Sequence, residues 1–301
     1  MNRDIGSDNY NIIKEFWKNS VNIKIRENST AKNNRCVIYA SSNGIWNPNT
    51  IDEFNKSIIK EDRYEWETFG GGELQKKEIF IRDILKEWYV NGVSNSLNSI
   101  DKLVDFLKKE TKGYQVVTVG NSAGGYIAAV LGIILSAEYI LDFSGQNNIW
   151  QYVFKDIEYP ELYIAKEIES KCKYFNIVPM IKESNIPIFY FFAASCEQDI
   201  MQYSLIREFN NVHTFAFRTK QHGVSVYPFN LPVIINMKKE QLLHLKKNDA
   251  YSQREFAYIT MKHTIFWVNY IKYWIRKIPI ILKRMLKVKI KKVLSLIRKK
   301  E

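Results

Sequence analysis

Cysteine is scarce in this sequence of 301 residues, which has only Cys36, Cys172 and Cys196. Three widely separated cysteines form neither a CxxC pair nor a disulfide framework. Their scarcity therefore excludes a disulfide-stapled scaffold and favours a reducing compartment.

Neither end of the chain carries a long apolar run. Residues 1–16 have acidic residues where an export signal needs a basic region followed by apolar residues. Near the C-terminus the longest unbroken apolar run, residues 278–282, has five residues, whereas a bilayer-spanning helix needs about 20. We therefore expect no export signal, no spanning segment in this region and a cytoplasmic location.

The excess of positive charge is confined to the C-terminal region. The chain has 44 basic and 32 acidic residues, a net charge of +12. Between Lys262 and Glu301 there are 13 basic residues and one acidic residue, which leaves 31 of each sign in residues 1–261. Because the body is neutral, the charge points to a partner of the C-terminal region alone.

The body is long enough to bury one sizeable hydrophobic core. Apolar residues make up 46% of the chain and aromatic residues 14%, and folds that mix helices and strands often reach this length as single domains. We expect one folded domain over residues 1–250 and a basic amphipathic helical tail over residues 251–301.

Strand-like segments alternate with helix-length segments along the body. Apolar or β-branched runs typical of buried strands occur at 36–40, 115–119, 138–143, 186–194 and 212–217, and polar–apolar alternation occurs at 22–27 and 63–69. Helical patterns occur at 99–109 and 126–135. This alternation predicts an α/β fold with a mostly parallel central sheet and helices on both faces. The active site of such a sheet lies at the carboxyl ends of its strands.

A tight turn, Gly120-Asn121-Ser122-Ala123-Gly124, joins the predicted strand 115–119 to the helix 126–135. Strand, turn and helix form the context of a G-x-S-x-G nucleophile elbow, which exposes a serine hydroxyl. The glycines avoid collisions where strand and helix crowd together, and the Ala123 amide at the helix start points toward a developing oxyanion. Ser122 is therefore the candidate nucleophile. The alternative is a structural glycine-rich turn that cradles a phosphate.

Residues 117–125, Val-Thr-Val-Gly-Asn-Ser-Ala-Gly-Gly, resemble the α/β-hydrolase superfamily, and the likeness extends over about residues 20–230. The blocks at 38–44 and 120–125, together with the basic tail, resemble hydrolase-like proteins of bacterial capsule and surface-polysaccharide clusters. The resemblance implies that residues 1–250 are an α/β-hydrolase-like catalytic domain, with a triad in the chain order serine, acid, histidine.

The sequence offers four histidines for the role of general base. Three of them have other settings: a strand pattern for His213, a lysine-rich helical segment for His244 and the tail for His263. His222 follows the strand 212–217 after a short loop and precedes Gly223, so its ring can reach the carboxyl edge of the sheet. We expect His222 to be the base. The alternative is an ordinary loop histidine.

The resemblance places the acid of the triad in the loop after residues 186–194, where Glu197 and Asp199 compete. The loop length of the family favours Asp199. Asp199 also opens the predicted helix 200–209, where its alternative role is that of an N-cap, and Glu197 is otherwise a solvated loop residue. The acid would hold the imidazole in the tautomer that accepts the serine proton.

A second oxyanion donor, beside the Ala123 amide, is expected from the loop after residues 36–40. The amides of Ser42 and Asn43 are the two candidates, and Asn43 is our choice. The chain has Ser-Ser-Asn-Gly at 41–44 where lipases have a His-Gly-Gly motif, so the pattern of the family leaves the donor open.

The tail has an amphipathic pattern, and Pro279 is predicted to separate two helices in it. On a helical wheel the apolar and basic residues form opposite faces: Leu282, Leu286, Ile290, Val293 and Ile297 on one, and Arg284, Lys287, Lys291 and Arg298 on the other. This pattern is typical of a helix in an anionic membrane interface, with Trp267 and Trp274 as anchors. The alternatives are a solvated basic helix docked on the body and a nonspecific nucleic-acid contact. Because the body has no recognised nucleic-acid module, we expect no nucleic-acid partner.

These features predict a serine hydrolase, an esterase that removes an acyl group from a saccharide or glycolipid precursor at the inner face of the membrane, with no metal or other cofactor. An acyltransferase on the same scaffold is the nearest alternative, since exclusion of water would let a sugar hydroxyl take the acyl group. A non-catalytic, membrane-associated accessory protein of surface-polysaccharide assembly is another. Four tryptophans are candidates for stacking on sugar rings or for the core: Trp46, Trp66, Trp88 and Trp150. The substrate and the oligomeric state are left open by the sequence.

Overall fold

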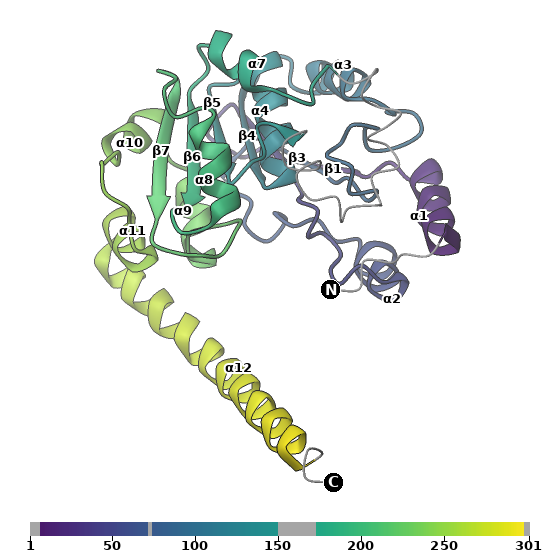
Figure 1. Ribbon diagram of the computed structural model, residues 1–301. Helices are drawn as coiled ribbons and strands as arrows, with labels where there is room; N and C mark the ends of the chain where they lie inside the picture. The colour runs from purple at the N-terminus through teal and green to yellow at the C-terminus, as the bar shows by residue number, and fades with distance from the viewer. Residues whose placement is uncertain (1–6, 72–73, 150–172, 298–301) are drawn as a thin grey trace.

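A seven-stranded sheet forms the centre of the computed structural model, which describes residues 7–71, 74–149 and 173–297 (Figure 1). The described strands are β1 (Ile23–Glu27), β2 (Arg35–Ala40), β3 (Lys77–Ile81), β4 (Gln115–Asn121), β5 (Tyr139–Phe143), β6 (Ile188–Ala193) and β7 (Val212–Phe217). They lie in the order β1-β3-β2-β4-β5-β6-β7. β1 is antiparallel to β3, and every other neighbouring pair is parallel. The predicted α/β class with a mostly parallel sheet is confirmed.

The composition of the central strands follows from their burial on both faces. Every residue of β2, β3, β5 and β6 is buried. Aliphatic and aromatic residues dominate these strands, as expected where helices cover both faces of a parallel sheet. The edge strand β7 mixes buried and partly exposed residues.

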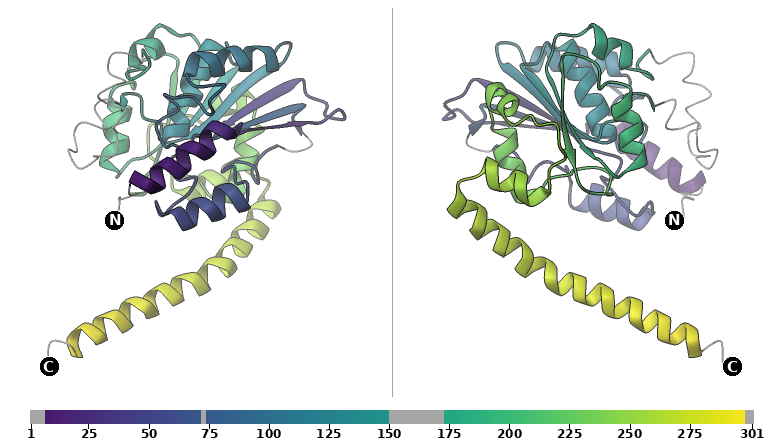
Figure 2. Two further views of the ribbon diagram at one scale, coloured as in Figure 1. Left: turned by 90° about the vertical axis from the view of Figure 1, so that its right-hand side faces the viewer. Right: turned by 60° about the vertical axis from the view of Figure 1, so that its left-hand side comes forward.

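Helices cover both faces of the sheet (Figure 2). One face carries α3 (Ile100–Glu110), α4 (Ala123–Ile134), α7 (Val178–Glu183) and α8 (Glu197–Ser204). The other face carries α9 (Leu231–Ile235), which follows the short helix η3 (Pro228–Asn230), together with α10 (Lys239–His244) and α11 (Gln253–Thr260). A satellite cluster around the buried Trp46 joins α1 (Ser7–Asn19), α2 (Ile51–Phe54) and η1 (Asn55–Lys60). The predicted helices 99–109 and 126–135 correspond to α3 and α4.

The order of the strands creates a switch point at the carboxyl edge of the sheet. β2 and β4 are neighbours, but the chain passes from β2 to β3 on one side and from β4 to β5 on the other. The loops that leave the carboxyl ends of β2 and β4 therefore diverge. Such a switch point is where open α/β sheets bind their ligands.

The segment 63–69 is not a strand, contrary to the prediction from its alternation. It forms turns whose aromatic side chains pack on the sheet, and Trp66 Nε1 donates to the carbonyl of Ala40 at 2.8 Å. The strand in this part of the chain is β3, which begins with the buried Lys77 and Glu78. Lys77 is paired with Glu110 of α3, with 2.7 Å between Nζ and Oε2.

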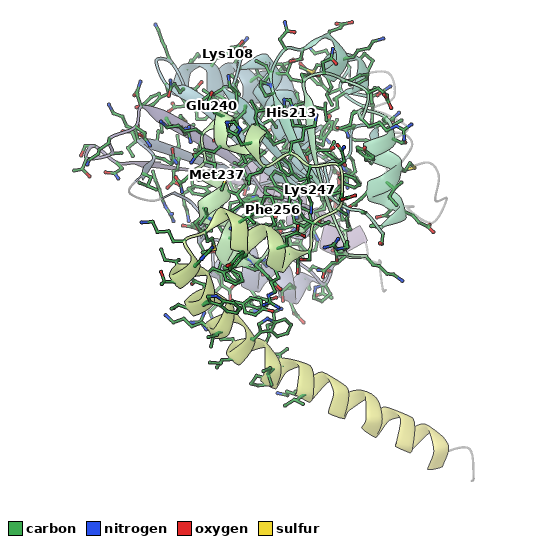
Figure 3. The ribbon with its side chains drawn as sticks, turned by 90° about the vertical axis from the view of Figure 1, so that its left-hand side faces the viewer. Lys108, His213, Met237, Glu240, Lys247 and Phe256 are labelled. Atoms are coloured by element: carbon green, nitrogen blue, oxygen red, sulfur yellow. The ribbon has the colours of Figure 1, made fainter. Side chains whose placement is uncertain are left out.

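The C-terminal region differs from the prediction in two respects. Tyr251 and Phe256 are buried among the aromatic residues of the sheet, and Figure 3 shows Phe256 where α11 meets the body. The tail therefore begins with α12 (His263–Ile297) and not at residue 251. α12 also continues through Pro279 as one helix, so the predicted division into two helices is wrong. The proline removes one backbone donor from a stretch of α12 that is exposed to solvent.

None of the described helices combines the length and the apolar character that a bilayer-spanning helix requires.

Candidate active site

Ser122 lies between β4 and α4 in a strained backbone conformation. Its φ of 56° and ψ of −120° fall in a region that costs residues with a side chain on the order of 1–3 kcal/mol. Two backbone hydrogen bonds hold the turn: Ser122 N–H donates to the Phe143 carbonyl at 2.9 Å, and Tyr126 N–H donates to the Ser122 carbonyl at 3.0 Å. The strain exposes the serine hydroxyl at the carboxyl edge of the sheet.

Gly120 and Gly124 are required by the close packing around this turn. A Cβ atom at Gly120 would overlap the carbonyl of Gly124. A Cβ atom at Gly124 would overlap the carbonyl of Ala40 at the end of β2. Both obstacles are backbone atoms of packed elements, so they cannot rotate away as a side chain would.

His222 reaches Ser122 from the loop that follows β7. Its Nε2 lies 2.8 Å from Ser122 Oγ, and its side chain is 29% exposed. The next residue, Gly223, has a φ of 103°, which a residue with a side chain rarely adopts. The structure therefore brings together two residues 100 positions apart in the chain, the same two that the sequence singled out.

Asp199, and not Glu197, contacts His222. Asp199 Oδ1 lies 2.5 Å from His222 Nδ1, and its side chain is fully buried, whereas Glu197 is exposed. α8 begins at Glu197 with Cys196 as its N-cap. Asp199 therefore lies in the first turn of the helix, and the alternative role as an N-cap is wrong.

The second oxygen of Asp199 is also satisfied. Oδ2 accepts the hydroxyl of Ser144 at 2.6 Å and the backbone N–H of Ala193 at 2.9 Å. Donors on both oxygens compensate a carboxylate for its loss of water. An ionised Asp199 accepts the Nδ1–H of His222, which leaves Nε2 free to accept the serine proton.

The loop after β2 lies against the elbow and distinguishes the two candidate oxyanion donors. The Ser42 N–H donates to Glu65 Oε2 at 2.6 Å. Across the described part of the chain, the N–H of Asn43 has no hydrogen-bond acceptor. The N–H of Ala123, at the first position of α4, has no acceptor within its helix. The N–H group of Ser42 is therefore already used, whereas those of Asn43 and Ala123 are not.

Gln146 contacts the nucleophile and was missed in the sequence. It lies in the loop after β5, is 2% exposed, and donates from Nε2 to Ser122 Oγ at 2.9 Å. Its position in the chain could have identified it, because β5 is the neighbour of β4 and the loop after β5 leaves the same edge of the sheet. Ser144 lies in the same loop and was also not predicted, although the same position could have identified it.

A second buried carboxyl, that of Asp142, lies one residue before the end of β5, beside the elbow. Its Oδ1 accepts the N–H of Gly145 at 2.7 Å, while Oδ2 has no hydrogen-bond partner among the described residues. A Cβ atom at Gly125 or Gly145 would overlap this carboxyl, so backbone encloses it. Burial raises the pKa of Asp142 from its usual value of 3.8 to about 7.

The other residues considered in the sequence lie away from Ser122 or belong to the core. His213 is in β7, where burial lowers the pKa of its ring. Helices carry the other two histidines, His244 in α10 and His263 at the start of α12. Three of the four tryptophans are buried, namely Trp46, Trp66 and Trp88, and Trp150 lies outside the described residues.

One group of side chains near the site has the spacing of metal ligands. The donor atoms of Cys196, Asp199 and His222 lie within 4.8 Å of one another. Two of these residues, Asp199 and His222, already hydrogen-bond each other. Cys196 and the buried Cys36 are free thiols.

The sheet carries the elbow after β4, the acid after β6 and the histidine after β7, and the three side chains meet at its carboxyl edge. The protein has an α/β-hydrolase fold. No family model and no curated protein matches its sequence.

Solved structures with similar folds include three proteins of 12–14% identity. The capsule O-acetyltransferase of Neisseria meningitidis serogroup A has 12% identity and a TM-score of 0.49, over 67% of this chain and 85% of that one. A lipase-esterase related protein from Clostridium acetobutylicum has 13% identity and a TM-score of 0.43, over 67% and 93%. An α/β-hydrolase enzyme from a lagoon-sediment metagenome of Mar Chica, Morocco, has 14% identity and a TM-score of 0.40, over 75% and 94%. The fold assignment rests on the features of this chain.

Proposed function

We propose that this protein is a serine esterase that removes an acyl group from a saccharide or glycolipid precursor. The observation that carries the proposal is the continuous hydrogen-bonded series Ser122–His222–Asp199, with 2.8 Å and 2.5 Å between the paired atoms. A serine hydroxyl is a weak nucleophile unless a base takes its proton. His222 is in position to do so.

In the proposed reaction Ser122 Oγ attacks the acyl carbonyl carbon while its proton moves to His222 Nε2. The amides of Asn43 and Ala123 bind the oxyanion that forms. His222 then gives the proton to the alcohol oxygen as the ester bond breaks, which leaves the acyl group on Ser122. Asp199 keeps the ring in the required tautomer and stabilises the imidazolium.

Labelling with a fluorophosphonate probe tests the nucleophile and its base. We expect the full chain to be labelled, and Ser122→Ala and His222→Ala to lose labelling by a factor on the order of 10³ or more. His213→Ala is the matched control for the histidine and should be labelled like the wild type. A folded wild-type chain without Ser122-dependent labelling would favour the accessory-protein alternative.

The acid is tested by a matched pair of amide substitutions. Asp199→Asn is expected to slow hydrolysis of p-nitrophenyl acetate by a factor on the order of 10³. An amide, unlike a carboxylate, does not hold His222 in the tautomer that carries its proton on Nδ1. Glu197→Gln should leave the rate within about twofold, since Glu197 is exposed. Equal rates for the two variants would remove Asp199 from the triad.

We also propose that α12 docks this enzyme on an anionic membrane. Six apolar side chains of α12 are each at least half exposed, and five of them recur at helical spacing: Val268, Ile271, Ile275, Ile278 and Leu282. We call them the apolar stripe, since their spacing of three and four residues puts them on one face of the helix. Lys272, Arg276 and Lys283, all exposed, lie on a neighbouring face, the arrangement of a helix that lies in a membrane interface.

The direction of α12 supports a lipid-bound substrate. Figures 1 and 2 show α12 extending beyond the carboxyl edge of the sheet, the edge that carries Ser122. A membrane along the apolar stripe would lie on the same side of the body as the nucleophile. An acylated saccharide on a lipid carrier would then meet the site without leaving the membrane surface.

A further inference from the structure

The amide of Gln146 lies beside both reacting groups of the triad. Its Nε2 is 2.9 Å from Ser122 Oγ and 3.5 Å from His222 Nε2. In the resting enzyme the serine hydroxyl donates its proton to His222 and accepts one from Gln146. The hydroxyl of Ser122 therefore has one hydrogen bond as a donor and one as an acceptor.

The orientation of this amide is fixed from its other side. Trp88 Nε1 lies 3.1 Å from Gln146 Oε1. An indole nitrogen is a donor only, so the atom of Gln146 that faces it must be the oxygen. The NH₂ group consequently faces Ser122, and the side chain supplies donors, not acceptors, to the site.

The loop that carries Trp88 is built at a conformational cost. Lys86, Trp88 and Tyr89 all have positive φ, of 60°, 51° and 60°, in the left-handed region that costs residues with a side chain of order 1 kcal/mol or more each. The buried carboxylate of Asp83 holds this backbone by accepting the N–H groups of Leu85, Glu87 and Tyr89, at 3.0, 2.6 and 2.9 Å. The backbone that Asp83 holds in this conformation places the Trp88 indole against Gln146.

The hydrogen bond from Gln146 to Ser122 changes during the reaction. Once Ser122 is acylated, its Oγ is an ester oxygen, which is a much poorer acceptor than a hydroxyl. The donor of Gln146 is then available beside His222 Nε2. An oxygen that accepts from Gln146 can direct its own O–H at that nitrogen.

We propose that Gln146 holds the second nucleophile, the water or sugar hydroxyl that removes the acyl group from Ser122. The oxygen of this hydroxyl accepts the Nε2–H of Gln146 and bonds to the acyl carbon while its proton moves to His222 Nε2. The bond between the acyl carbon and Ser122 Oγ then breaks, and His222 returns the proton to Oγ. Gln146 thereby acts in deacylation, the half of the reaction in which its donor is free.

This role rests on the proposed esterase function, and the two are separated by measuring both halves of the reaction. Reaction with a fluorophosphonate reports the first half alone. Quenching the full chain after mixing with p-nitrophenyl acetate, and measuring acetyl-Ser122 by intact mass, reports the second half. The variants are Gln146→Ala, which removes the donor, and Gln146→Glu, which keeps the size and the acceptor for Trp88.

We expect deacylation to slow about tenfold or more in both variants, the effect of losing one hydrogen bond, so that acetyl-Ser122 accumulates. Fluorophosphonate labelling should stay within about threefold of wild type. Trp88→Phe leaves Gln146 in place but frees its amide to turn, so a smaller slowing of the same step is expected.

Three kinds of result would overturn this role. If labelling and deacylation fall together in Gln146→Ala, the residue only supports the structure, and if neither changes it has no part in the reaction. A wild-type acetyl-enzyme that never turns over would also overturn it. Absence of Ser122-dependent labelling in the wild type would instead refute the esterase function itself.

Discussion

The hydroxyl of Ser144 donates to the oxygen of Asp199 that His222 does not use. In Ser144→Ala that oxygen keeps only the backbone N–H of Ala193. A hydrogen bond to a charged group contributes about 1.5–3 kcal/mol, so we expect the free energy of unfolding in urea to fall by about 2 kcal/mol. Turnover should fall several-fold, because Asp199 loses part of its fixed orientation.

Ser225→Ala is the matched control for this prediction. Ser225 is equally buried, but its hydroxyl donates to an uncharged acceptor, the carbonyl of Gly223, at 3.3 Å. Its loss should cost about 1 kcal/mol or less. An equal loss of stability in the two variants would mean that Ser144 contributes nothing specific to Asp199.

The residues that could be found in the sequence are those with a local signature. Ser122 is marked by its two glycines, and His222 and Asp199 by their places after predicted strands. Gln146 and Trp88 have no such mark, because their contact joins loops 58 positions apart. The choice between Ser42 and Asn43 likewise depended on Glu65, whose contact with the loop after β2 no spacing reveals.

At the scale of the secondary-structure elements, the carboxyl end of β5 carries a titrating group inside the core. Burial raises the pKa of Asp142 from 3.8 to about 7, so the folded state binds its proton more tightly than the unfolded state does. Its contribution to stability is therefore complete below about pH 4 and is lost as the pH rises through 7.

Asp142→Asn is expected to flatten this dependence. Between pH 5 and pH 8 the wild type should lose about 2–3 kcal/mol more of its unfolding free energy than the variant does. Urea unfolding at both pH values measures the difference. Asp105→Asn in α3, an exposed position, is the control and should follow the wild type. A variant with the same pH slope as the wild type would show that Asp142 stays ionised in the fold.

The strands that could be predicted are those whose side chains are apolar on both faces. β5 and β6 are such strands, and their boundaries were found within two residues. β3 was missed because it begins with Lys77 and Glu78, which are buried only through partners elsewhere in the fold: Glu110 for Lys77 and the Tyr39 hydroxyl for Glu78. Segment 63–69 was wrongly predicted to be a strand because Tyr64 and Trp66 are buried although their segment forms no strand. Periodicity records which side chains are buried, and not whether the backbone forms a ladder.

At the scale of the whole molecule, α12 is anchored beside the loop of the proposed base. Tyr227, five positions after His222, has its ring 5.8 Å from that of Tyr270 and 5.0 Å from that of Tyr273, between ring centroids. Phe229 contacts Tyr273 in the same cluster at 5.8 Å. Because aromatic packing fixes the root of α12 on this loop, the proposed membrane surface and the triad would have a set orientation.

The proposed membrane surface predicts how the full chain partitions between water and vesicles. It should float with vesicles that contain phosphatidylglycerol and much less with pure phosphatidylcholine. Each basic residue near an anionic surface contributes about 1 kcal/mol, so reversing two charges in the double variant Lys272→Glu/Arg276→Glu should weaken binding at least about 30-fold. The double variant Ile275→Gln/Ile278→Gln should weaken binding to the same vesicles by removing part of the apolar stripe.

The control for charge reversal is Lys108→Glu/Lys109→Glu in α3, which alters net charge by the same amount. Figure 3 shows Lys108 at the end of the body away from α12, and both lysines are exposed. If binding depends on α12, this control floats like the wild type. Raising the salt from 0.1 to 0.5 M should weaken the binding of the wild type and of the control equally, since surface charges are screened. If the α3 and α12 reversals lose binding to the same degree, net charge alone attracts the protein, and α12 is not its membrane-docking element.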